Sequence, residues 1–418
     1  MRLIRRLSIP LLVLACTAVP VYWAFPDGLP AARSLAIVLG WAGCGLLLAS
    51  LLLMLRETWL AHWLGGLERM YRWHHRVGMA AYLLLLAHPL ALAADALMDS
   101  PRRAWQVLFP STLLGPIWLG WLALLLLMLG LAATFSTRLA YRTWRWLHFL
   151  LGIGVLCSLL HVLLLGIDEP VLPLLVLCAL LLGWRLIGED SARFARPYVV
   201  AAALHASDDV LEITLAPLAR PVAANAGQFV LVAFFSGAGF RACGEFHPFT
   251  VSAVDADGQL RISVKALGDC TRRMQALVSG VPARVHGPFG SFLANRPAAR
   301  QLWLAGGIGI TPFLALLRSA RLVHPTTLFY LYRSEADAAF LSELQSVAAA
   351  DRKLALYTLA TGDEPPNLDL LLAEAGALAG APECYLCGPP GMLAAAVKTL
   401  RRHGIRPRHI HFENFGFR

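Results

Sequence analysis

Long apolar runs separated by short basic connections make up the first 187 residues of the chain. Each run is close to the ~20 residues that an α-helix needs to cross the apolar core of a bilayer. The pattern predicts a membrane all-α bundle of six helices, in which the first and last spans are the shortest. The six spans are expected at residues 8–25, 34–55, 75–97, 111–134, 146–166 and 170–187.

Arginine residues gather in the connections on one side of this expected bundle. The N-terminus, the second-to-third connection, the fourth-to-fifth connection and the segment after the last span are rich in arginine, whereas the opposite side carries only Arg33, Arg102 and Arg103. Because arginine-rich connections remain in the cytoplasm, both termini and the second half of the chain are predicted to be cytoplasmic.

Short runs of alternating apolar and polar residues replace the long runs after Pro197. They are separated by Gly, Pro and Asp, which predicts a small antiparallel β-barrel. These runs lie at 198–204, 210–215, 228–235, 249–253 and 260–265. From about residue 299, strands and helices alternate, as in a parallel α/β domain. Its strands are expected in LWLAG (302–306), TLFYLYRS (327–334), LALYTLA (354–360) and ECYLCGPPG (383–391). The expected domains are 1–190, 191–297 and 298–418, and no internal repeat is visible.

Composition narrows the possible functions. Hydrophobic residues make up 58% of the 418 residues and charged residues 15%, against about 25% charged in a typical soluble domain. The net charge of +10 follows from the arginine-rich connections, and no array of basic and aromatic residues indicates a nucleic-acid surface. The eight cysteines include a lone CxxC at Cys384 and Cys387 but no group of four thiolates for an iron–sulfur cluster.

Four histidines lie at matching positions on two of the expected membrane helices. His74 and His88 bracket the third span, and His148 and His161 bracket the fifth. At a rise of 1.5 Å per residue, the members of each pair lie about 20 Å apart along their helix. A titratable side chain inside a membrane is costly and needs a functional reason. The two helices offer matched pairs of ligands at two depths, which predicts two haems with two axial histidines each.

The spacing leaves two points open. His75 competes with His74 as the ligand near the cytoplasmic side. The 14-residue step in the third span returns to nearly the same helix face, whereas the 13-residue step in the fifth span does not. A bend or bulge near Gly152 and Gly154 is therefore expected in the fifth span.

Three motifs in the expected barrel fit a flavin nucleotide. HPFTVSA at 247–253 places a hydroxyl and a flat aromatic ring on one strand, where they suit the flavin ring and its ribityl phosphate. The segment LGDCT at 267–271 opens a helix, and a helix N-terminus suits a pyrophosphate. GPFG at 287–290 predicts a tight turn where the backbone approaches closely.

Two glycine-rich turns in the α/β domain fit a nicotinamide nucleotide. AGGIGITP at 305–312 follows a strand and opens a helix, so its backbone can approach a phosphate. YLCGPPGM at 385–392 is a second loop at a strand end, where open α/β sheets bind ligands, and it places Cys387 near the nicotinamide. Arg333 and Ser334 fit the 2′-phosphate of NADPH, with a solvated turn as the alternative.

The motifs HPFT, LGDCT, GPFG, GGIGITP and CGPPGM, in this order and with the paired histidines, resemble the ferric reductase and NADPH oxidase superfamily over nearly the whole chain. The resemblance implies FAD in the barrel, NADPH or NADH in the α/β domain, and a ferredoxin reductase-like arrangement of the two. It also implies that an aromatic residue near the C-terminus, Phe417 or alternatively Phe415, stacks on the flavin. The chain looks like a minimal, bacterial-type member, which implies the bacterial inner membrane.

The resemblance and the motifs together give the candidate site residues. Thr250, Cys387 and Phe417 are the candidates for catalysis. The candidates for cofactor binding are His247, Pro248, Phe249, Thr250, Ser252, Lys265, Gly268, Asp269, Thr271, Gly287, Pro288, Phe289, Gly290, Gly306, Gly307, Gly309, Thr311, Pro312, Arg333, Ser334, Cys387, Gly388, Pro389 and Phe417.

The expected function is a transmembrane NAD(P)H oxidoreductase that passes electrons through FAD and two b-type haems to a small molecule on the outer side. Molecular oxygen, giving superoxide, is the first candidate for that acceptor, and a ferric chelate is the alternative. No nucleic acid and no obligatory protein partner is expected. Two other hypotheses are a haem membrane subunit that donates electrons to a protein partner, and a channel or scaffold with a degenerate reductase domain.

Overall fold

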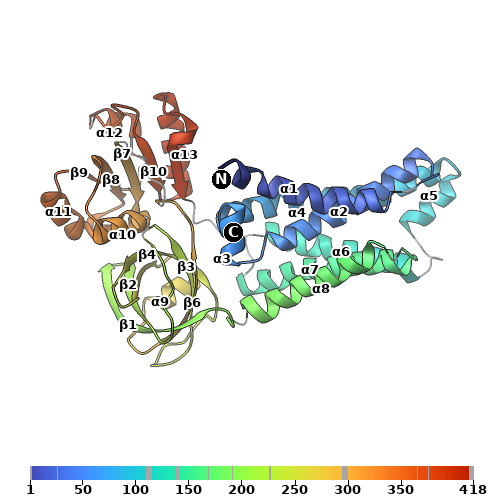
Figure 1. Ribbon diagram of the computed structural model, residues 1–418, viewed down its shortest axis with the longest axis horizontal. Coiled ribbons are helices and arrows are strands. Elements are labelled where there is room, and N and C mark those ends of the chain that lie inside the picture. Colours follow the sequence, from blue (N-terminus) through green and yellow to red (C-terminus); the bar gives the residue numbers. More distant parts are fainter. Residues whose placement is uncertain are drawn as a thin grey trace. The chain divides into compact units, whose positions relative to one another are not determined.

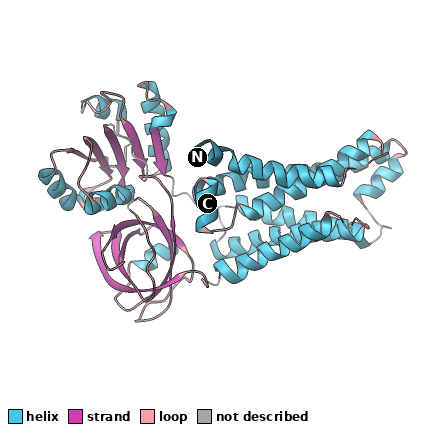
Figure 2. Cartoon of the chain, viewed as in Figure 1, coloured by secondary structure: helices cyan, strands magenta, loops and turns pink. Residues whose placement is uncertain are grey.

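The chain divides into two compact units, Met1–Arg193 and Phe194–Arg418, called here the N-terminal and the C-terminal unit. The N-terminal unit is helical, and the C-terminal unit is built mainly on strands (Figure 2). The computed structural model describes residues 2–25, 27–109, 115–136, 139, 141–167, 169–190, 192–225, 227–293, 300–364, 366–374 and 376–413.

The apolar runs of the first half of the chain form long helices (Figure 1). Among the described residues, four helices are long and apolar enough to cross a membrane. They are α2 (Ala31–Leu52), α4 (Leu67–Leu97), α6 (Gly115–Phe135) and α7 (Tyr141–Leu164). The first and last expected spans fall in α1 (Arg2–Trp23) and α8 (Val171–Trp184), whose apolar segments are shorter than the other four.

The connections contain helices that the apolar pattern did not predict. These are α3 (Thr58–Leu64), α5 (Pro101–Leu108) and a π-helical turn (Arg185–Asp190). Helix α4 also begins at Leu67, before the expected start of its apolar span, so His74 and His75 both lie inside it. Polar residues extend this helix because its apolar part already fixes the helical conformation of the segment.

Glycine allows the long helices to pack closely in two pairs, α2 along α4 and α6 along α7 (Figure 1). A Cβ atom on Gly43 of α2 would lie 2.5 Å from Leu85 Cγ of α4. A Cβ atom on Gly130 of α6 would lie 2.6 Å from Leu151 Cδ2 of α7. Small residues at helix contacts are typical of membrane bundles, in which close packing replaces the hydrophobic effect.

The bulge expected near Gly152 and Gly154 is absent, since the described helix α7 runs unbroken from Tyr141 to Leu164. Both glycines instead lie at helix contacts. A Cβ atom on Gly152 would lie 2.7 Å from Leu182 Cδ2, and one on Gly154 would lie 3.2 Å from Leu127 Cγ. Their small size serves packing on two sides of α7.

The first part of the C-terminal unit is a closed antiparallel barrel. Its strands are β1 (Arg196–Ser207), β2 (Val210–Pro217), β3 (Phe229–Phe234), β4 (His247–Val254), β5 (Leu260–Lys265) and β6 (Pro282–Phe289), in the order β1-β2-β5-β4-β3-β6. The five runs expected from the sequence are β1 to β5. Strand β6 was missed, although it closes the barrel against β1. Alternate residues such as Ile213, Val232, Ile262 and Val285 fill the interior.

The second part of the C-terminal unit is a five-stranded parallel sheet in the order β11-β10-β7-β8-β9. Its strands are β7 (Gln301–Gly306), β8 (Thr326–Tyr332), β9 (Leu354–Ala360), β10 (Glu383–Cys387) and β11 (Ile410–Glu413). All but β11 were expected from the sequence. Its helices are α10 (Thr311–Ser319), α11 (Leu341–Ala350), α12 (Leu368–Glu374) and α13 (Pro390–Arg402). Helices α10 and α11 cover one face, and α12 and α13 cover the other.

An ion network joins the barrel to the sheet. Arg318 of α10 donates from Nη1 to Glu212 Oε1 of β2 at 2.6 Å and from Nε to Glu343 Oε1 of α11 at 2.7 Å. Ser252 of β4 donates to the same Glu212 carboxylate at 3.0 Å. The side chains of Arg318 and Glu212 are only 13% and 15% exposed. Water therefore solvates these charges poorly, and each charge is stabilised mainly by the other. The network therefore fixes α10 against two strands of the barrel.

We expect Arg318→Met to lower the thermal unfolding midpoint of the C-terminal unit by about 6–12 °C. Loss of one partner from a buried ion pair costs about 3 kcal/mol or more, and a domain of this size loses about 2–4 °C per kcal/mol. Scanning fluorimetry of the full chain in detergent measures the midpoint. Arg321→Met changes an exposed arginine nearby and is the control. Equal midpoints for the two variants would show that the network contributes nothing.

Candidate functional site

Two loops meet at the middle of the parallel sheet. Strands β7 and β10 are neighbours, with Ala305 opposite Cys387 at their carboxyl ends. The strand order reverses between them, since β8 and β9 continue on one side and β11 lies on the other. Open α/β sheets bind ligands at such a reversal point, outside the carboxyl ends of the strands. The structure therefore brings GGIGITP and CGPPGM together at one edge of the sheet.

The glycines of these loops allow direct packing of one loop on the other. A Cβ atom on Gly309 would collide with the carbonyl oxygen of Cys387 and would lie 2.8 Å from Gly388 N. A Cβ atom on Gly306 would lie 2.9 Å from Pro389 Cδ. Gly306 and Gly309 therefore serve contact between the loops, which the sequence alone could not separate from contact with a phosphate.

Gly307 has a different environment. Its φ of +51° favours glycine, and a Cβ atom there would lie 3.9 Å from Lys265 Nζ. Lys265 ends β5 of the barrel and also pairs with Asp209 at 3.0 Å. Thr311 and Pro312, which follow this turn, are buried, and the Thr311 hydroxyl donates to a carbonyl within the turn. A cation from the barrel thus lies beside the glycine-rich turn of the sheet.

Arg333 and Ser334 follow β8, the next strand of the sheet. The Arg333 side chain is 75% exposed, and its Nε lies 3.9 Å from Asp363 Oδ1. The Ser334 hydroxyl donates to Asp337 Oδ2 at 2.8 Å, within its own turn. Both residues lie at the same sheet edge as the two loops. The carboxylates of Asp363 and Asp337 lie beside them at this edge.

Strand β3 brings the HPFT and GPFG motifs together. Phe229 of β3 lies opposite Thr250 of β4 and opposite Phe289 of β6, and the two phenyl rings stack at 5.7 Å. A Cβ atom on Gly290 would lie 3.2 Å from the Phe229 ring and 3.3 Å from Glu413 Oε1 of β11. The two barrel motifs and the last described strand of the sheet therefore surround one position.

The other residues of these two motifs differ in their burial and in whether they have a hydrogen-bond partner. His247 Nε2 is buried and has no hydrogen-bond partner among the described residues, and burial lowers the pKa of His247. Pro248 is partly buried and Phe249 lies in the barrel core, whereas the Ser252 hydroxyl is engaged by the Glu212 carboxylate. Next to Pro288, Gly287 has a φ of +144°, which favours glycine.

Helix α9 (Asp269–Met274) begins directly after Gly268, as the LGDCT motif predicted. The Thr271 hydroxyl accepts hydrogen bonds from the backbone N–H groups of Leu267 and Gly268, at 3.0 and 2.8 Å. Asp269 pairs with Arg272 at 2.6 Å. Side chains within the turn thus fix its backbone, while Leu267, Gly268 and Asp269 remain exposed.

In the N-terminal unit, two of the four histidines lie close together, with their ring planes at 69° to each other. The ring centres of His74 on α4 and His148 on α7 are 6.0 Å apart. His74 Nδ1 lies 2.7 Å from Ser50 Oγ and 3.1 Å from Ser50 O of α2. His148 Nδ1 lies 3.0 Å from Thr134 Oγ1 of α6. The competing His75 is exposed, which favours His74 as the ligand.

The other two histidines bond to backbone carbonyls. His88 Nδ1 donates to Ala36 O at 2.7 Å, and His161 Nδ1 donates to Pro116 O at 2.6 Å. A carbonyl oxygen can only accept, so both rings carry their proton on Nδ1. His148 also carries its proton on Nδ1. Thr134 donates its one hydroxyl hydrogen to Gly130 O at 2.9 Å, so His148 must be the donor in its bond to Thr134.

Glycines cover two of these rings. A Cβ atom on Gly40 of α2 would lie 3.0 Å from His88 Nδ1, and one on Gly120 of α6 would lie 3.1 Å from His161 Cε1. Helix α2 therefore packs against the imidazole of His88 on α4, and helix α6 packs against the imidazole of His161 on α7. None of these supporting residues was identified from the sequence.

The four imidazoles fit axial ligands of haem. A proton on Nδ1 leaves the Nε2 lone pair for a metal, and a hydrogen bond from the other nitrogen is the usual support of a metal-binding histidine. At metal–nitrogen distances of about 2 Å, two rings on opposite sides of one ion have centres about 6 Å apart. The separation of His74 and His148 matches that value.

Three family models match consecutive parts of the chain. They are the ferric reductase like transmembrane component at residues 39–159, the FAD-binding domain at 195–302 and the oxidoreductase NAD-binding domain at 303–398. The chain belongs to the ferric reductase and NADPH oxidase-like family. This family member is therefore a membrane oxidoreductase with FAD and NAD(P)H as cofactors, as the sequence motifs predicted.

Several curated relatives match about half of this family member. The reductase component of a naphthalene 1,2-dioxygenase/salicylate 5-hydroxylase system from Ralstonia is 28% identical over 52% of the chain and 67% of the relative. The naphthalene 1,2-dioxygenase reductase component of Pseudomonas putida is 25% identical over 47% of the chain and 62% of the relative. An aromatic O-demethylase reductase subunit from Amycolatopsis is 28% identical over 54% and 72%. The chain thus spans about two thirds of these reductases.

Solved structures cover a similar share of the family member. The Amycolatopsis cytochrome P450 reductase superposes with a TM-score of 0.45 and 23% identity, over 53% of this chain and 69% of that chain. Phthalate dioxygenase reductase superposes with a TM-score of 0.46 and 20% identity, over 54% of this chain and 70% of that one.

One buried carboxylate beside the two loops was missed by sequence reasoning. Glu413 ends β11, lies opposite Cys387 in the sheet and is 7% exposed. A lone acidic residue at the end of an apolar strand was the available signal. The C-terminal aromatic residues Phe415 and Phe417, expected to stack on the flavin, lie outside the described residues.

The CxxC pair is separated by the sheet, in agreement with the sequence interpretation. Cys384 lies in the apolar cluster on one face of the sheet, and Cys387 lies in the cluster on the other face. Burial raises the pKa of Cys384 to about 12. The two thiols therefore do not form a redox pair.

We expect Gly309→Ala to raise KM for the nicotinamide nucleotide, or lower kcat/KM, by about 10–100-fold, since misplacement by about 1 Å costs that much. The added methyl collides with the backbone carbonyl of Cys387, so the two loops must move apart. Steady-state oxidation of NADPH and NADH with an artificial acceptor measures the change. Gly391→Ala, in the first turn of α13, meets no atom within 4 Å and is the control. Unchanged kinetics for Gly309→Ala would show that the loop contact is not needed.

Proposed function

We propose that this protein is a transmembrane NAD(P)H oxidoreductase that takes electrons at the cytoplasmic face of a bacterial inner membrane and delivers them to a small molecule on the outer side. The observation that carries the proposal is the set of four imidazoles, each held at Nδ1 from a neighbouring helix. The membrane bundle has six helices at 1–190, followed by a flavin domain at 191–297 and a nucleotide domain at 298–418.

The nucleotide and the flavin are held by residues from both parts of the C-terminal unit. FAD, when bound, accepts hydride from NAD(P)H, and haem iron carries single electrons. The Gly307 turn and Lys265 bind phosphate, and Thr250 with Phe289 and Gly290 orients the flavin ring. Cys387 lies at the nicotinamide, and the buried Glu413 beside it limits access of water.

The histidine pairs determine what kind of chemistry the membrane domain supports. His74 with His148, and His88 with His161, would hold two b-type haems, each through two imidazoles. Haem held in this way would supply single-electron transfer to an acceptor rather than binding of a substrate at the iron. Molecular oxygen, giving superoxide, is the acceptor that we propose first, and a ferric chelate is the alternative.

A second candidate function follows from the relatives. The reductase components from Ralstonia and Pseudomonas putida are named as parts of dioxygenase systems. By analogy, this protein would pass its electrons to a protein partner rather than to oxygen. The match of residues 39–159 to the ferric reductase like transmembrane component favours the first candidate.

The choice of nucleotide rests on the sheet edge after β8. The exposed guanidinium of Arg333 suits a 2′-phosphate, whereas the carboxylate of Asp363 beside it disfavours one. We infer that the negative charge of Asp363 offsets much of the attraction between Arg333 and the 2′-phosphate of NADPH. Both NADPH and NADH therefore serve as donors.

Substitution of the histidines tests the haem assignment. We expect His74→Ala, His88→Ala, His148→Ala and His161→Ala each to remove one bis-histidine haem, which lowers the haem content by about half. His75→Ala is the matched control and should keep both haems. Absorption spectra and haem-to-protein ratios measure the outcome, and NAD(P)H-dependent flavin reduction should persist in every variant. Full haem content in the four variants would refute the assignment.

The acceptor is tested with the purified full-length protein and NADPH. We expect cytochrome c reduction that superoxide dismutase suppresses, without any added protein. NADPH oxidation that requires a ferric chelate would instead assign the protein as a ferric reductase. Oxidation that requires a membrane or cytosolic protein fraction would favour the partner hypothesis.

A further inference from the structure

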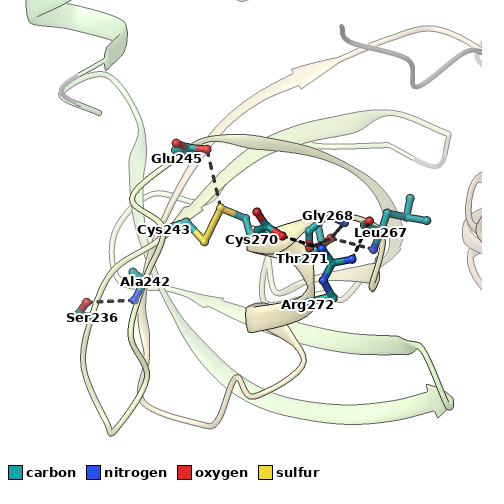
Figure 3. The surroundings of a disulfide bond; sticks show 10 residues. Ser236, Ala242, Cys243, Glu245, Leu267, Gly268, Cys270, Thr271 and Arg272 are labelled. Carbon is teal, nitrogen blue, oxygen red and sulfur yellow. Dashed lines mark hydrogen bonds and ion pairs between the residues drawn. A yellow bond between two sulfur atoms is a disulfide. The ribbon is translucent and has the colours of Figure 1, made fainter. Parts of the chain in front are cut away.

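Cys243 and Cys270 form a disulfide in the barrel (Figure 3). Their Cα atoms are 5.8 Å apart, and 27 residues separate them in the sequence. Cys243 lies in the loop between β3 and β4, and Cys270 lies in the first turn of α9. Both are partly exposed, so small molecules can reach them. This distinguishes them from Cys384 and Cys387, which are buried.

The disulfide joins the loop before the HPFT strand to the LGDCT turn, and the sequence predicts that these two motifs bind the flavin nucleotide. The loop that carries Cys243 leads directly into the HPFT strand, and Cys270 belongs to the LGDCT turn. Residues 241–246 have no regular secondary structure, and residues 267–269 are exposed. The covalent link therefore fixes the two segments relative to each other where few other constraints act on them.

Local hydrogen bonds beside each cysteine limit its movement within its own segment when the disulfide is broken, but they do not fix one segment relative to the other. Ala242, next to Cys243, donates to Ser236 Oγ at 3.1 Å, and Thr271, next to Cys270, accepts from Gly268 N at 2.8 Å (Figure 3). The local structure around each cysteine therefore persists when the bond is reduced, and the same disulfide can form again.

The surroundings also indicate which sulfur reacts first. Glu245 Oε2 lies 3.8 Å from Cys270 Sγ (Figure 3). A carboxylate beside a thiol disfavours the thiolate, which is the reactive form. Cys243 is therefore the sulfur that attacks an external oxidant, and Cys270 is the one that resolves the product.

We propose that Cys243 and Cys270 are a site of reversible oxidation by low-molecular-weight disulfides, and that this oxidation controls how tightly the barrel holds FAD. The effect on FAD rests on the flavin site proposed above. The Cys243 thiolate attacks one sulfur of the small disulfide and releases one small thiol. The Cys270 thiol then displaces the second small thiol. The protein loses two thiol hydrogens and gains one S–S bond, and the small disulfide is reduced to two thiols.

The disulfide favours FAD binding because it orders the loop before the ligand arrives. A free loop must lose conformational freedom when it binds a ligand, and a cross-link removes part of that cost. We therefore expect FAD to dissociate about tenfold more slowly from the oxidised protein than from the reduced protein.

The state of the thiols is measured directly. The full-length protein in detergent is equilibrated with mixtures of reduced and oxidised glutathione in the presence of a metal chelator, then alkylated and analysed by peptide mass spectrometry. We expect Cys243 and Cys270 to become protected together as the mixture becomes oxidising. Alkylation of both at every ratio, or protection of both at every ratio, would overturn the proposal. So would protection that the chelator removes, because Glu245, His247 and Cys270 lie close enough to bind a metal ion.

The effect on the flavin is measured as the rate at which FAD fluorescence appears after dilution. The wild type should release FAD about tenfold more slowly after oxidation, whereas Cys243→Ser/Cys270→Ser should release it at one rate in all mixtures. Equal rates of FAD release from the oxidised and the reduced wild type would contradict the regulatory role. Thr250→Ala in the same assay tests the flavin site separately. If it leaves FAD binding unchanged, the proposed flavin site fails, and the alkylation result still decides whether the cysteine pair is redox-active.

Discussion

The N-terminal unit depends on the hydrogen bonds of its four histidines. A membrane interior offers no water, so a polar ring nitrogen must find its partner within the protein. Ser50, Thr134 and the carbonyls of Ala36 and Pro116 supply those partners. Each bond places the proton on Nδ1 and leaves Nε2 as the unprotonated ring nitrogen. The same bonds that make the histidines tolerable in a membrane therefore also prepare them for a metal.

In the C-terminal unit the corresponding constraint is close approach of backbone to backbone. Gly309 has no side chain because the carbonyl of Cys387 occupies that space, and this contact draws the ends of β7 and β10 together. Arg318 then ties the helix that follows the first loop to Glu212 of the barrel. Helix α10 thus begins at the nucleotide loop and ends at a barrel contact. These two contacts connect the glycine-rich loops of the sheet to strand β2 of the barrel.

Much of the fold could be predicted from the sequence because periodicity and turn residues are local properties. The apolar spans, five barrel strands and four sheet strands were found in this way. Strand β6 was missed because Pro282 and the Gly287–Pro288 pair indicate a turn, although Val285 points into the barrel core. Strand β11 was missed because its four residues give too short a pattern.

The supporting residues of the site could not be predicted, because they are defined by tertiary contacts. Ser50 lies 24 residues from His74, and Ala36 lies 52 residues from His88. A backbone carbonyl leaves no trace in a sequence, so the partners of His88 and His161 had no signal at all. The pairing of Cys243 with Cys270 was equally hidden, since neither cysteine belongs to a recognised spacing motif.

The two helix pairs share an arrangement that is not a sequence repeat. In both, one histidine bonds to a hydroxyl-bearing residue and the other bonds to a carbonyl beside a covering glycine. The distance along the helix differs, however, since Ala36 and Ser50 are 14 residues apart and Pro116 and Thr134 are 18 apart. What recurs is one hydrogen-bond acceptor at each depth, and either a side chain or a backbone carbonyl can provide it. The covering glycine follows the accepting carbonyl by four residues in both pairs, from Ala36 to Gly40 and from Pro116 to Gly120, so the arrangement recurs within one helical turn although the longer spacing does not.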